Sequence, residues 1–437
     1  MVLLITLSAC ATLDRDQVWL ANQLSERTGA APRASDEDEA SLPPGISTED
    51  GVTEDEAVAI ALWRNAAFAE ALAALGFARA DVLQAGLLSN PVFSILFPLG
   101  AKQLEFTLKL PAEALLLRPK RLAVARAEAD RIAERLVQSG LDVVRDVRVG
   151  WAEARRAGDK ARLAAEAVRL RERIESITDA QRAAGDASTI DVATARADVV
   201  LAREESARLD GERRVVEARL RVLIGLTSGD VVLRFDDVAS GLGDVTSDEV
   251  LRASALAARP DVRAAELAVD AAVARRSLSR WEVVSFAGIA DANGKGTNGF
   301  EIGPGLDVTI PVLNWNQGGM ARADAEEVRA RRQLDAVRQR VELEVTEAHV
   351  RLLAAGAALA ALRADALTEL ERAEDAATAG YRAGDVSLLM LLQTTGQLLT
   401  ARRREVDAVA DVARAHAELE RNVGHRLDVT LSSARLR

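Results

Sequence analysis

Two regions of the chain alternate apolar and polar residues with the period of a β-strand. One run spans residues 103–110 and the other spans residues 300–310, and each follows a second apolar run, at 91–97 and at 281–290. Because successive side chains of a strand point to opposite faces, this pattern predicts two hairpins and therefore four strands. In water such a sheet can pack on helices. In lipid, four strands leave an open edge, so the chain would have to oligomerise.

The rest of the chain has the pattern of long helices. No proline occurs from Lys120 to Arg259, or from Val312 to the C-terminus. We expect residues 112–180 to form one rod with a reach on the order of 100 Å. Apolar residues spaced by three and four indicate either a coiled-coil seam or an amphipathic helix of a soluble bundle. The two sets are Leu163, Ala167, Leu170, Ile174 and Ile177, and Leu359, Leu362, Ala366, Leu370, Ala373 and Ala377.

The chain also contains an internal repeat. Gly185 recurs as Gly384 and Gly225 recurs as Gly424, each 199 positions later (384 − 185 and 424 − 225). A constant offset indicates two copies of one structural unit. We expect a first repeat at 51–225, a linker with a short equatorial segment at 226–247, a second repeat at 248–425 and a C-terminal tail at 426–437.

Each repeat contains a Gly-Asp-x-Ser segment that interrupts the helical pattern. Gly185 and Gly384 suit the left-handed residue that ends a helix, and Ser188 and Ser387 suit the cap that begins the next one. The sequence therefore predicts a tight turn between two long helices in each half.

The N-terminus has the features of a lipoprotein signal at residues 1–10. Leu7-Ser8-Ala9-Cys10 follows an apolar run and resembles a bacterial lipobox, which predicts a lipid on Cys10. The basic segment that usually begins a signal is missing, which suggests a start site placed too late or a truncated signal. The alternative is a chance match in a short apolar start. Residues 11–50 are rich in Ser, Pro, Asp and Glu and predict an extended tether.

Composition narrows the possible classes. The net charge of −11 argues against nucleic-acid binding. A single cysteine and the scattered His349, His416 and His425 suggest no metal site or cofactor, and we expect these histidines to be ordinary surface or packing residues. No apolar run is long enough for a membrane helix. No nucleophile with its base and no phosphate loop is present, so we do not expect an enzyme.

The order of these features resembles the TolC-like outer-membrane efflux protein family. The residues that carry the resemblance are Asn90-Pro91, Arg259-Pro260-Asp261-Val262, Ile310-Pro311-Val312-Leu313, and the helix ends Leu223-Ile224-Gly225 and Asn422-Val423-Gly424. It implies a mainly α protein with a membrane β part, built from two tandem repeats. Three chains would form a 12-stranded β-barrel in the outer membrane, continued by an α-helical barrel across the periplasm.

The resemblance also implies a function. The homotrimer would be lipid-anchored in the outer membrane and passively conduct small toxic compounds, such as drugs or metal ions, delivered by an inner-membrane pump through a periplasmic adaptor. Secretion of protein (type I) or polysaccharide by the same fold is one alternative, and a soluble or peripheral coiled-coil scaffold is another. The residues expected to dock the adaptor, which also cap helices, are Arg182, Gly185, Ser188, Arg382, Gly384 and Ser387.

A ring of three identical side chains is expected at the closed aperture. In several relatives acids lie six and nine positions after the second tip glycine, where this chain has Met390 and Gln393. We therefore expect Asp191 and Asp385 to border the aperture, with Arg382 as a partner, because a carboxylate ring favours cations. The alternative is that each is a solvated carboxylate at a helix start.

Overall fold

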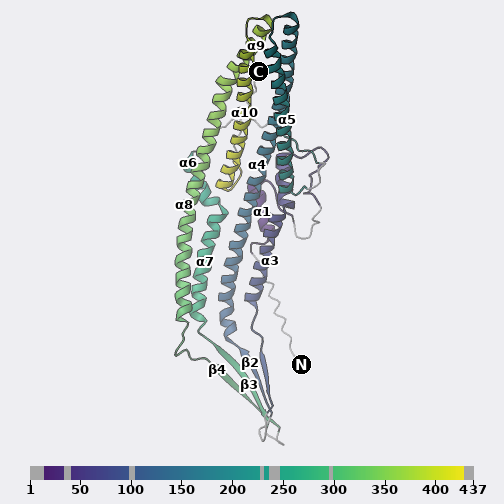
Figure 1. Cartoon of the computed structure of the whole chain (residues 1–437). Helices are drawn as coiled ribbons and strands as arrows, with labels where there is room; N and C mark the ends of the chain where they lie inside the picture. Colours follow the sequence, from purple (N-terminus) through teal and green to yellow (C-terminus); the bar gives the residue numbers. More distant parts are fainter. Residues whose placement is uncertain are drawn as a thin grey trace. The chain divides into compact units, whose positions relative to one another are not determined.

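The structure is a computed structural model that describes residues 14–33, 41–97, 104–226, 231–235, 247–294 and 299–427. Most of its elements are labelled in Figure 1. The first half contains α1 (Gln17–Thr28), α2 (Glu54–Arg64), α3 (Ala66–Gly86), β1 (Val92–Leu96), β2 (Glu105–Pro111), α4 (Glu113–Ala184) and α5 (Thr189–Leu223). The second half contains α6 (Asp248–Ala258), α7 (Pro260–Trp281), β3 (Phe286–Gly294), β4 (Phe300–Val308), α8 (Gln317–Ala361), the π-helical turn η2 (Leu362–Leu367), α9 (Thr368–Ala383) and α10 (Leu388–Val423). From α2 onward, both halves run through two helices, a hairpin, a long helix and a returning helix.

The described residues form two compact units. The sheet unit comprises the described residues within Met1–Asn22, Glu70–Gln138 and Arg259–Arg340. The tip unit comprises those within Gln23–Ala69, Ser139–Ala258 and Val341–Arg437. Helices α1, α3, α4 and α8 each contribute residues to both units.

All four strands of the sheet unit form one antiparallel sheet in the order β1-β2-β3-β4. Strand β1 pairs with β2 in the first hairpin, and β3 pairs with β4 in the second. Strand β2 also pairs with β3 along Glu105–Pro111, which joins the two halves of the chain. The predicted hairpins are confirmed, with one shift of a boundary. The strand expected at 281–290 is Phe286–Gly294 because α7 continues through Trp281, where the Glu282 amide still donates to the Leu278 carbonyl.

Helix α1 corrects the prediction of an extended tether over residues 11–50. The Asp16 carboxylate caps it by accepting from the Trp19 amide at 2.9 Å. One turn apart, Leu20 and Leu24 are fully buried. Within the tip unit Leu24 fills the space beside Gly140, where an added Cβ would lie only 2.5 Å from a Leu24 methyl. A compositional bias toward polar residues hid this short apolar face.

The long rod predicted over 112–180 is confirmed as α4, a helix of 72 residues. In the second half, η2 interrupts the rod after α8. A π-turn inserts one residue into the helical register. For that reason the seam predicted in the second half is partly wrong: Leu367 is buried instead of Ala366, and Ala373 is exposed.

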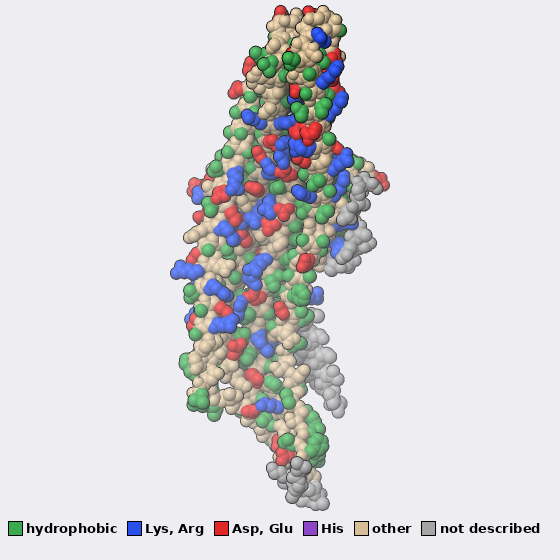
Figure 2. Space-filling view, viewed as in Figure 1, with side chains coloured by type: hydrophobic (Ala, Val, Ile, Leu, Met, Phe, Trp, Pro, Cys, Tyr) green, Lys and Arg blue, Asp and Glu red, His purple; other side chains and the backbone are tan. Residues whose placement is uncertain are grey.

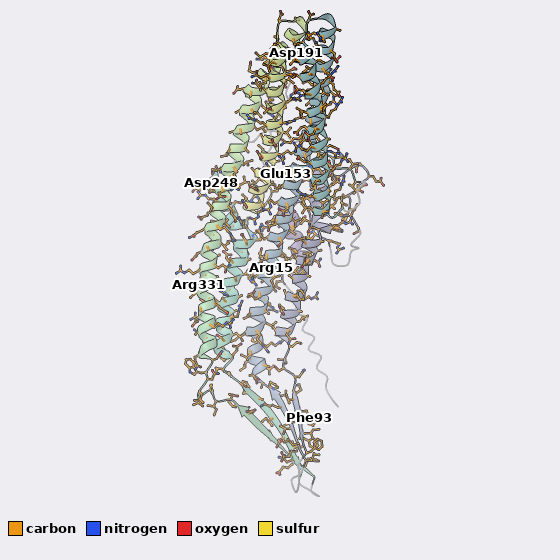
Figure 3. The ribbon with its side chains drawn as sticks, viewed as in Figure 1. Arg15, Phe93, Glu153, Asp191, Asp248 and Arg331 are labelled. Atoms are coloured by element: carbon orange, nitrogen blue, oxygen red, sulfur yellow. The ribbon has the colours of Figure 1, made fainter. Side chains whose placement is uncertain are left out.

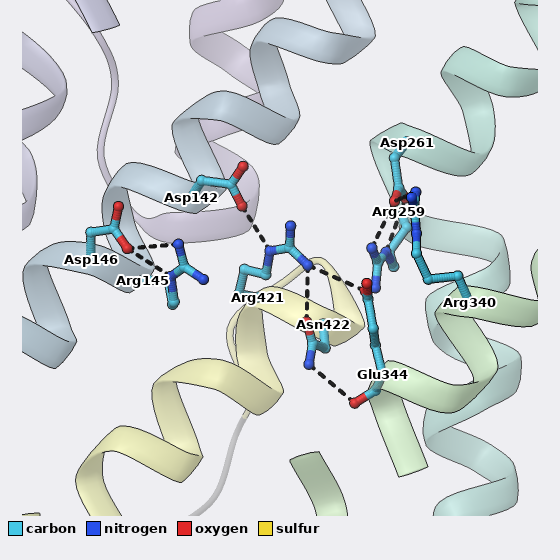
Figure 4. A network of polar contacts seen from close by, with 9 residues as sticks. All are labelled: Asp142, Arg145, Asp146, Arg259, Asp261, Arg340, Glu344, Arg421 and Asn422. Atoms are coloured by element: carbon cyan, nitrogen blue, oxygen red, sulfur yellow. Dashed lines mark hydrogen bonds and ion pairs between the residues drawn. The ribbon is translucent and has the colours of Figure 1, made fainter. Parts of the chain in front are cut away.

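The side chain of Arg421, near the end of α10, contacts the middle of two other helices in the tip unit (Figure 4). Its Nε donates to Asp142 of α4 at 2.7 Å, and its Nη1 lies 3.3 Å from a Glu344 carboxylate oxygen of α8. The neighbouring Asn422 donates its side-chain amide to the Glu344 carbonyl at 3.1 Å. A guanidinium shared by two carboxylates fixes the end of α10, which precedes the repeated Gly424.

In the sheet unit, the buried Arg259 immediately precedes α7. The Arg259 side chain is 1% exposed, and its Nη2 lies 2.7 Å from a carboxylate oxygen of Asp261. Pro260, at the first position of the helix, has no N–H to leave unpaired. The Arg-Pro-Asp motif is therefore a helix start that also neutralises a buried charge.

His416 lies in the tip unit near two arginines. Burial, followed by the charges of Arg148 and Arg426, lowers the pKa of His416 to about 4. Arg148 itself forms an ion pair with Glu420, one turn further along α10. The imidazole is therefore neutral at neutral pH in the folded protein.

We expect His416 to destabilise the fold in acid. Its folded pKa lies below the unfolded value of 6.5, so its contribution is complete above about pH 6.5 and is lost as the pH falls toward about 4. The full loss is roughly 3 kcal/mol. Denaturant unfolding of wild type and His416→Gln at several pH values tests this. An equally steep loss of stability in the variant would contradict it.

Candidate functional site: tip turns and two-faced sheet

The turn between α4 and α5 has the geometry that the sequence predicts. Gly185 has φ +92°, and its amide donates to the Arg182 carbonyl at 3.1 Å. The next amide, of Asp186, donates to the Gln181 carbonyl at 2.8 Å. These two bonds form a Schellman motif, which satisfies the last carbonyls of α4. Ser188 then caps α5 by accepting from the Asp191 amide.

The turn between α9 and α10 repeats this geometry. Gly384 has φ +83°, its amide donates to the Tyr381 carbonyl, and the Asp385 amide donates to the Gly380 carbonyl at 2.9 Å. Ser387 caps α10 by accepting from the Met390 amide at 3.3 Å. The predicted capping roles of both glycines and both serines are confirmed.

A small core brings the two turns together. Side-chain oxygens of Thr178 and Tyr381 lie 2.9 Å apart, and the Gln181 amide donates to the Tyr381 carbonyl at 2.9 Å. Tyr381, the only tyrosine of the chain, packs with Ile174 and Leu388 among the buried residues. Sequence reasoning missed Tyr381, although a single tyrosine three residues before a tip glycine was visible.

The four aperture candidates differ in their surroundings. Asp191, labelled in Figure 3, completes a capping box by accepting from the Ser188 amide at 2.8 Å. The hydrogen bonds from the Ser188 side chain and backbone lower the pKa of Asp191, so the carboxylate is ionised at neutral pH. Met390 occupies the equivalent position of α10 (390 − 191 = 199) and cannot return such a bond. Gln393 is exposed one turn further along α10.

The remaining charged candidates are exposed at the turns. Arg182 reaches the Ala187 carbonyl across the first turn at 3.5 Å. Arg382 and Asp385 are both exposed, and the expected ion pair between them is absent among the described residues. Both side chains are therefore available to contacts from outside this chain.

Two exposed apolar residues at the turns were not predicted. Ile190 is 76% exposed and Leu389 is 75% exposed, and they occupy equivalent positions in α5 and α10. Each follows the capping serine by two residues. The offset of 199 positions would have found this pair.

Residues paired across neighbouring strands point to the same face of the sheet. In this sheet the pairing gathers apolar residues on one face and mainly polar residues on the other. Figure 2 shows hydrophobic side chains gathered on the sheet. The Phe93 and Phe106 rings are stacked at 6.0 Å, and the Phe106 and Phe300 rings lie at 5.4 Å. The apolar face also carries Ile95, Leu108, Leu110, Ala290, Ala292, Ile302, Pro304 and Leu306. Much of it is open: Ile302 is 76% exposed and Leu306 is 68% exposed.

The opposite face carries charges and hydrogen bonds. Lys109 forms an ion pair with Asp307, and the Thr107 hydroxyl donates to Asp291 at 2.8 Å. These contacts join β2 to β3 and to β4, so the sheet is held together on this face by polar side chains. The outer edges of β1 and β4 pair with no further strand in the described part of the chain.

We also searched the described residues for clusters of metal-ligating side chains and for helices that could span a membrane. Within the described ranges, no group of three or more His, Cys, Asp or Glu side chains could hold a metal ion. Among the same residues, no single helix is long and apolar enough to cross a membrane; the bent pair α2 and α3 passes by length and composition only. Cys10 lies outside the described residues.

Long helices with paired turns and a small two-faced sheet are the fold of outer-membrane channel proteins, to which the structure is similar. VceC from Vibrio cholerae, an outer membrane protein, aligns with a TM-score of 0.69 at 16% identity, covering 85% of this chain and 96% of VceC. CusC aligns with a TM-score of 0.72 at 18% identity, covering 90% of this chain and 99% of CusC. The CmeC outer membrane channel of Campylobacter jejuni gives 0.69 at 14% identity and covers 92% of each chain. At such identities the likeness establishes the fold.

The match to a protein family covers a smaller part of the chain than the structural alignments do. Residues 251–425 match the model of the family described as outer membrane efflux protein. This range begins within α6 and ends just after α10, so it contains the second hairpin and the second tip turn. It confirms the resemblance that the sequence motifs predict. A sequence comparison with curated proteins gives no match.

We expect the tip glycine to be required for its backbone conformation. Replacing Gly384 by Ala puts a side chain at φ +83° and costs about 1–2 kcal/mol of stability. Gly396, inside α10 with no atom within 4 Å of an added Cβ, is the matched control. There, Ala stabilises by about 0.5–1 kcal/mol. Thermal unfolding followed by circular dichroism compares the two, and equal effects would contradict the assignment.

Proposed function

We propose that this chain is the subunit of a trimeric outer-membrane efflux channel. The observation that carries the proposal is the four-stranded sheet, with one exposed apolar face, one mainly polar face and two edges that pair with no other strand among the described residues. In water an apolar face of this kind is a liability for aggregation. In a bilayer it fits lipid, provided that both edges are paired.

The need to pair both edges of the sheet determines how many copies assemble. An antiparallel sheet that crosses hydrocarbon must close, because unpaired backbone groups there cost several kcal/mol each. When β1 of one copy pairs with β4 of the next, three copies supply twelve strands and leave no edge. The apolar face then contacts lipid and the face with Lys109 and Asp307 lines water.

The helices supply the rest of the path. We infer that α4, α5, α8, α9 and α10 of three copies form a periplasmic tunnel, with the turns at Gly185 and Gly384 at one end of it. A periplasmic adaptor would contact the exposed side chains of these turns. They are Arg182, Ser188, Ile190, Arg382, Ser387 and Leu389. An inner-membrane pump would supply the energy and the channel would conduct passively.

We propose that the channel conducts small toxic compounds, such as drugs or metal ions. Support comes from the family match over residues 251–425, whose description names efflux. Secretion of protein or polysaccharide would use the same fold. A soluble coiled-coil scaffold is disfavoured by the exposed phenylalanines and isoleucines of the sheet. We also propose that Cys10 carries a lipid that tethers the chain to the outer membrane.

Adjacent positions of β1 test the membrane assignment. Ile95 is on the apolar face and Ser94 is on the polar face. A lysine facing lipid near the middle of the bilayer costs about 2–4 kcal/mol, whereas one facing the lumen is tolerated. Ile95→Lys should therefore lose membrane-embedded trimer and single-channel conductance in planar bilayers. Ser94→Lys should keep both.

The two variants also discriminate between the alternatives. Mass measured in detergent should give three chains for wild type and Ser94→Lys. A wild-type protein that stays monomeric and soluble without detergent, or equal behaviour of the two lysine variants, would overturn the channel.

The aperture is a separate proposal. We expect Asp191→Asn with Asp385→Asn to lower the cation-to-anion permeability ratio, because rings of carboxylates attract cations. In Asp191→Asn the new side-chain amide oxygen can still accept from the Ser188 amide, so the cap remains while the charge is removed. Asp186→Asn, at the position of the first turn equivalent to Asp385, is the control. Unchanged selectivity in the double variant rejects the aperture assignment.

A further inference from the structure

The loop between β4 and α8 exposes four large apolar side chains in a row of six residues. Ile310 is 77% exposed, Val312 78%, Leu313 92% and Trp315 54%. In Figure 2 hydrophobic side chains gather at the base of α8, where this loop lies. Neither the strand nor the helix that it joins needs these side chains for its own packing.

The backbone of the loop is fixed. The Thr309 amide donates to the Ser285 carbonyl at 3.0 Å, and the Asn316 side-chain amide donates to the Ser279 carbonyl at 2.7 Å. Asn316 has φ +62°, an uncommon conformation for a residue other than glycine. Its side chain lies over Gly319, where an added Cβ would come within 2.2 Å of the Asn316 Oδ1. Bonds to α7 and the turn before β3 thus hold the loop while its apolar side chains point outward.

Aromatic and basic side chains lie near the end of α7, the helix to which Asn316 of the loop is bonded. The Lys120 ammonium sits 5.2 Å from the Trp281 ring centre and 3.0 Å from the Ser277 hydroxyl. Arg280 and Trp281 are exposed at the end of α7, beside the exposed acid Glu282. Tryptophan with lysine or arginine is typical of the boundary between lipid headgroups and hydrocarbon.

We propose that the loop of residues 309–316 binds the phospholipid headgroup layer and sets the depth of the channel in the membrane. The apolar stripe of β4 continues into it, since Leu306, Val308 and Ile310 occupy alternate positions of one face. A lipid surface accepts both the apolar side chains and the nearby cations. This inference rests on the proposed membrane location of the sheet.

Depth-dependent quenching tests the proposal. Leu313→Cys and Leu306→Cys are each labelled with an environment-sensitive fluorophore and reconstituted as the full chain into phosphatidylethanolamine and phosphatidylglycerol vesicles. Lipids carry a nitroxide either close to the headgroup or near the end of the acyl chain. The Leu313 label should be quenched more by the shallow nitroxide, and the Leu306 label more by the deep one.

Leu389→Cys, also highly exposed but in the tip unit, is the matched control and should be quenched by neither lipid. The parent chain, with Cys10 as its single cysteine, gives the background of labelling. Quenching at Leu306 but not at Leu313 overturns the inference alone, and would mean that water or a neighbouring copy covers the loop. Loss of quenching at both positions overturns the proposed membrane function as well.

Discussion

Hydrogen bonding at the two open edges of the sheet is the constraint on which the rest of the structure depends. Four strands satisfy the backbone of β2 and β3 on both sides but leave β1 and β4 with a free edge in the described chain. The apolar face, with stacked Phe93 and Phe106, is exposed beside them. A sheet of this composition is stable where further strands pair with the edges and lipid covers the face. The proposed trimer satisfies both needs with copies of the same chain.

The turns that join the long helices are built by local interactions. Both Gly185 and Gly384 take the left-handed conformation, and a serine caps the helix that follows each. One difference between the two turns is that Asp191 closes a capping box that Met390 cannot close. Asp191 therefore has a complete structural role without any aperture. A carboxylate that caps a helix can still contribute its charge to a ring, so the two roles are compatible.

Sequence patterns were most reliable where the structure is local. Alternation gave four strands, and glycine followed by Ser three positions later gave both turns. The errors have specific causes. Residues 17–28 form α1 because Leu20 and Leu24 become buried by other parts of the chain, which a polar composition does not reveal. The strand after Trp281 starts late because helix α7 competes for the same residues. The π-turn at Leu362–Leu367 moved the apolar seam by one residue.

The sequence by itself determined the long helices, the four strands and the two tip turns, since strand alternation and turn residues follow from neighbours along the chain. Only the tertiary structure decided which side chains meet. It placed Tyr381 against Thr178 across the two turns, paired β2 with β3, and held the 309–316 loop through Asn316. These contacts join residues far apart in sequence. Their formation depends on packing and backbone geometry that no local pattern of residues encodes.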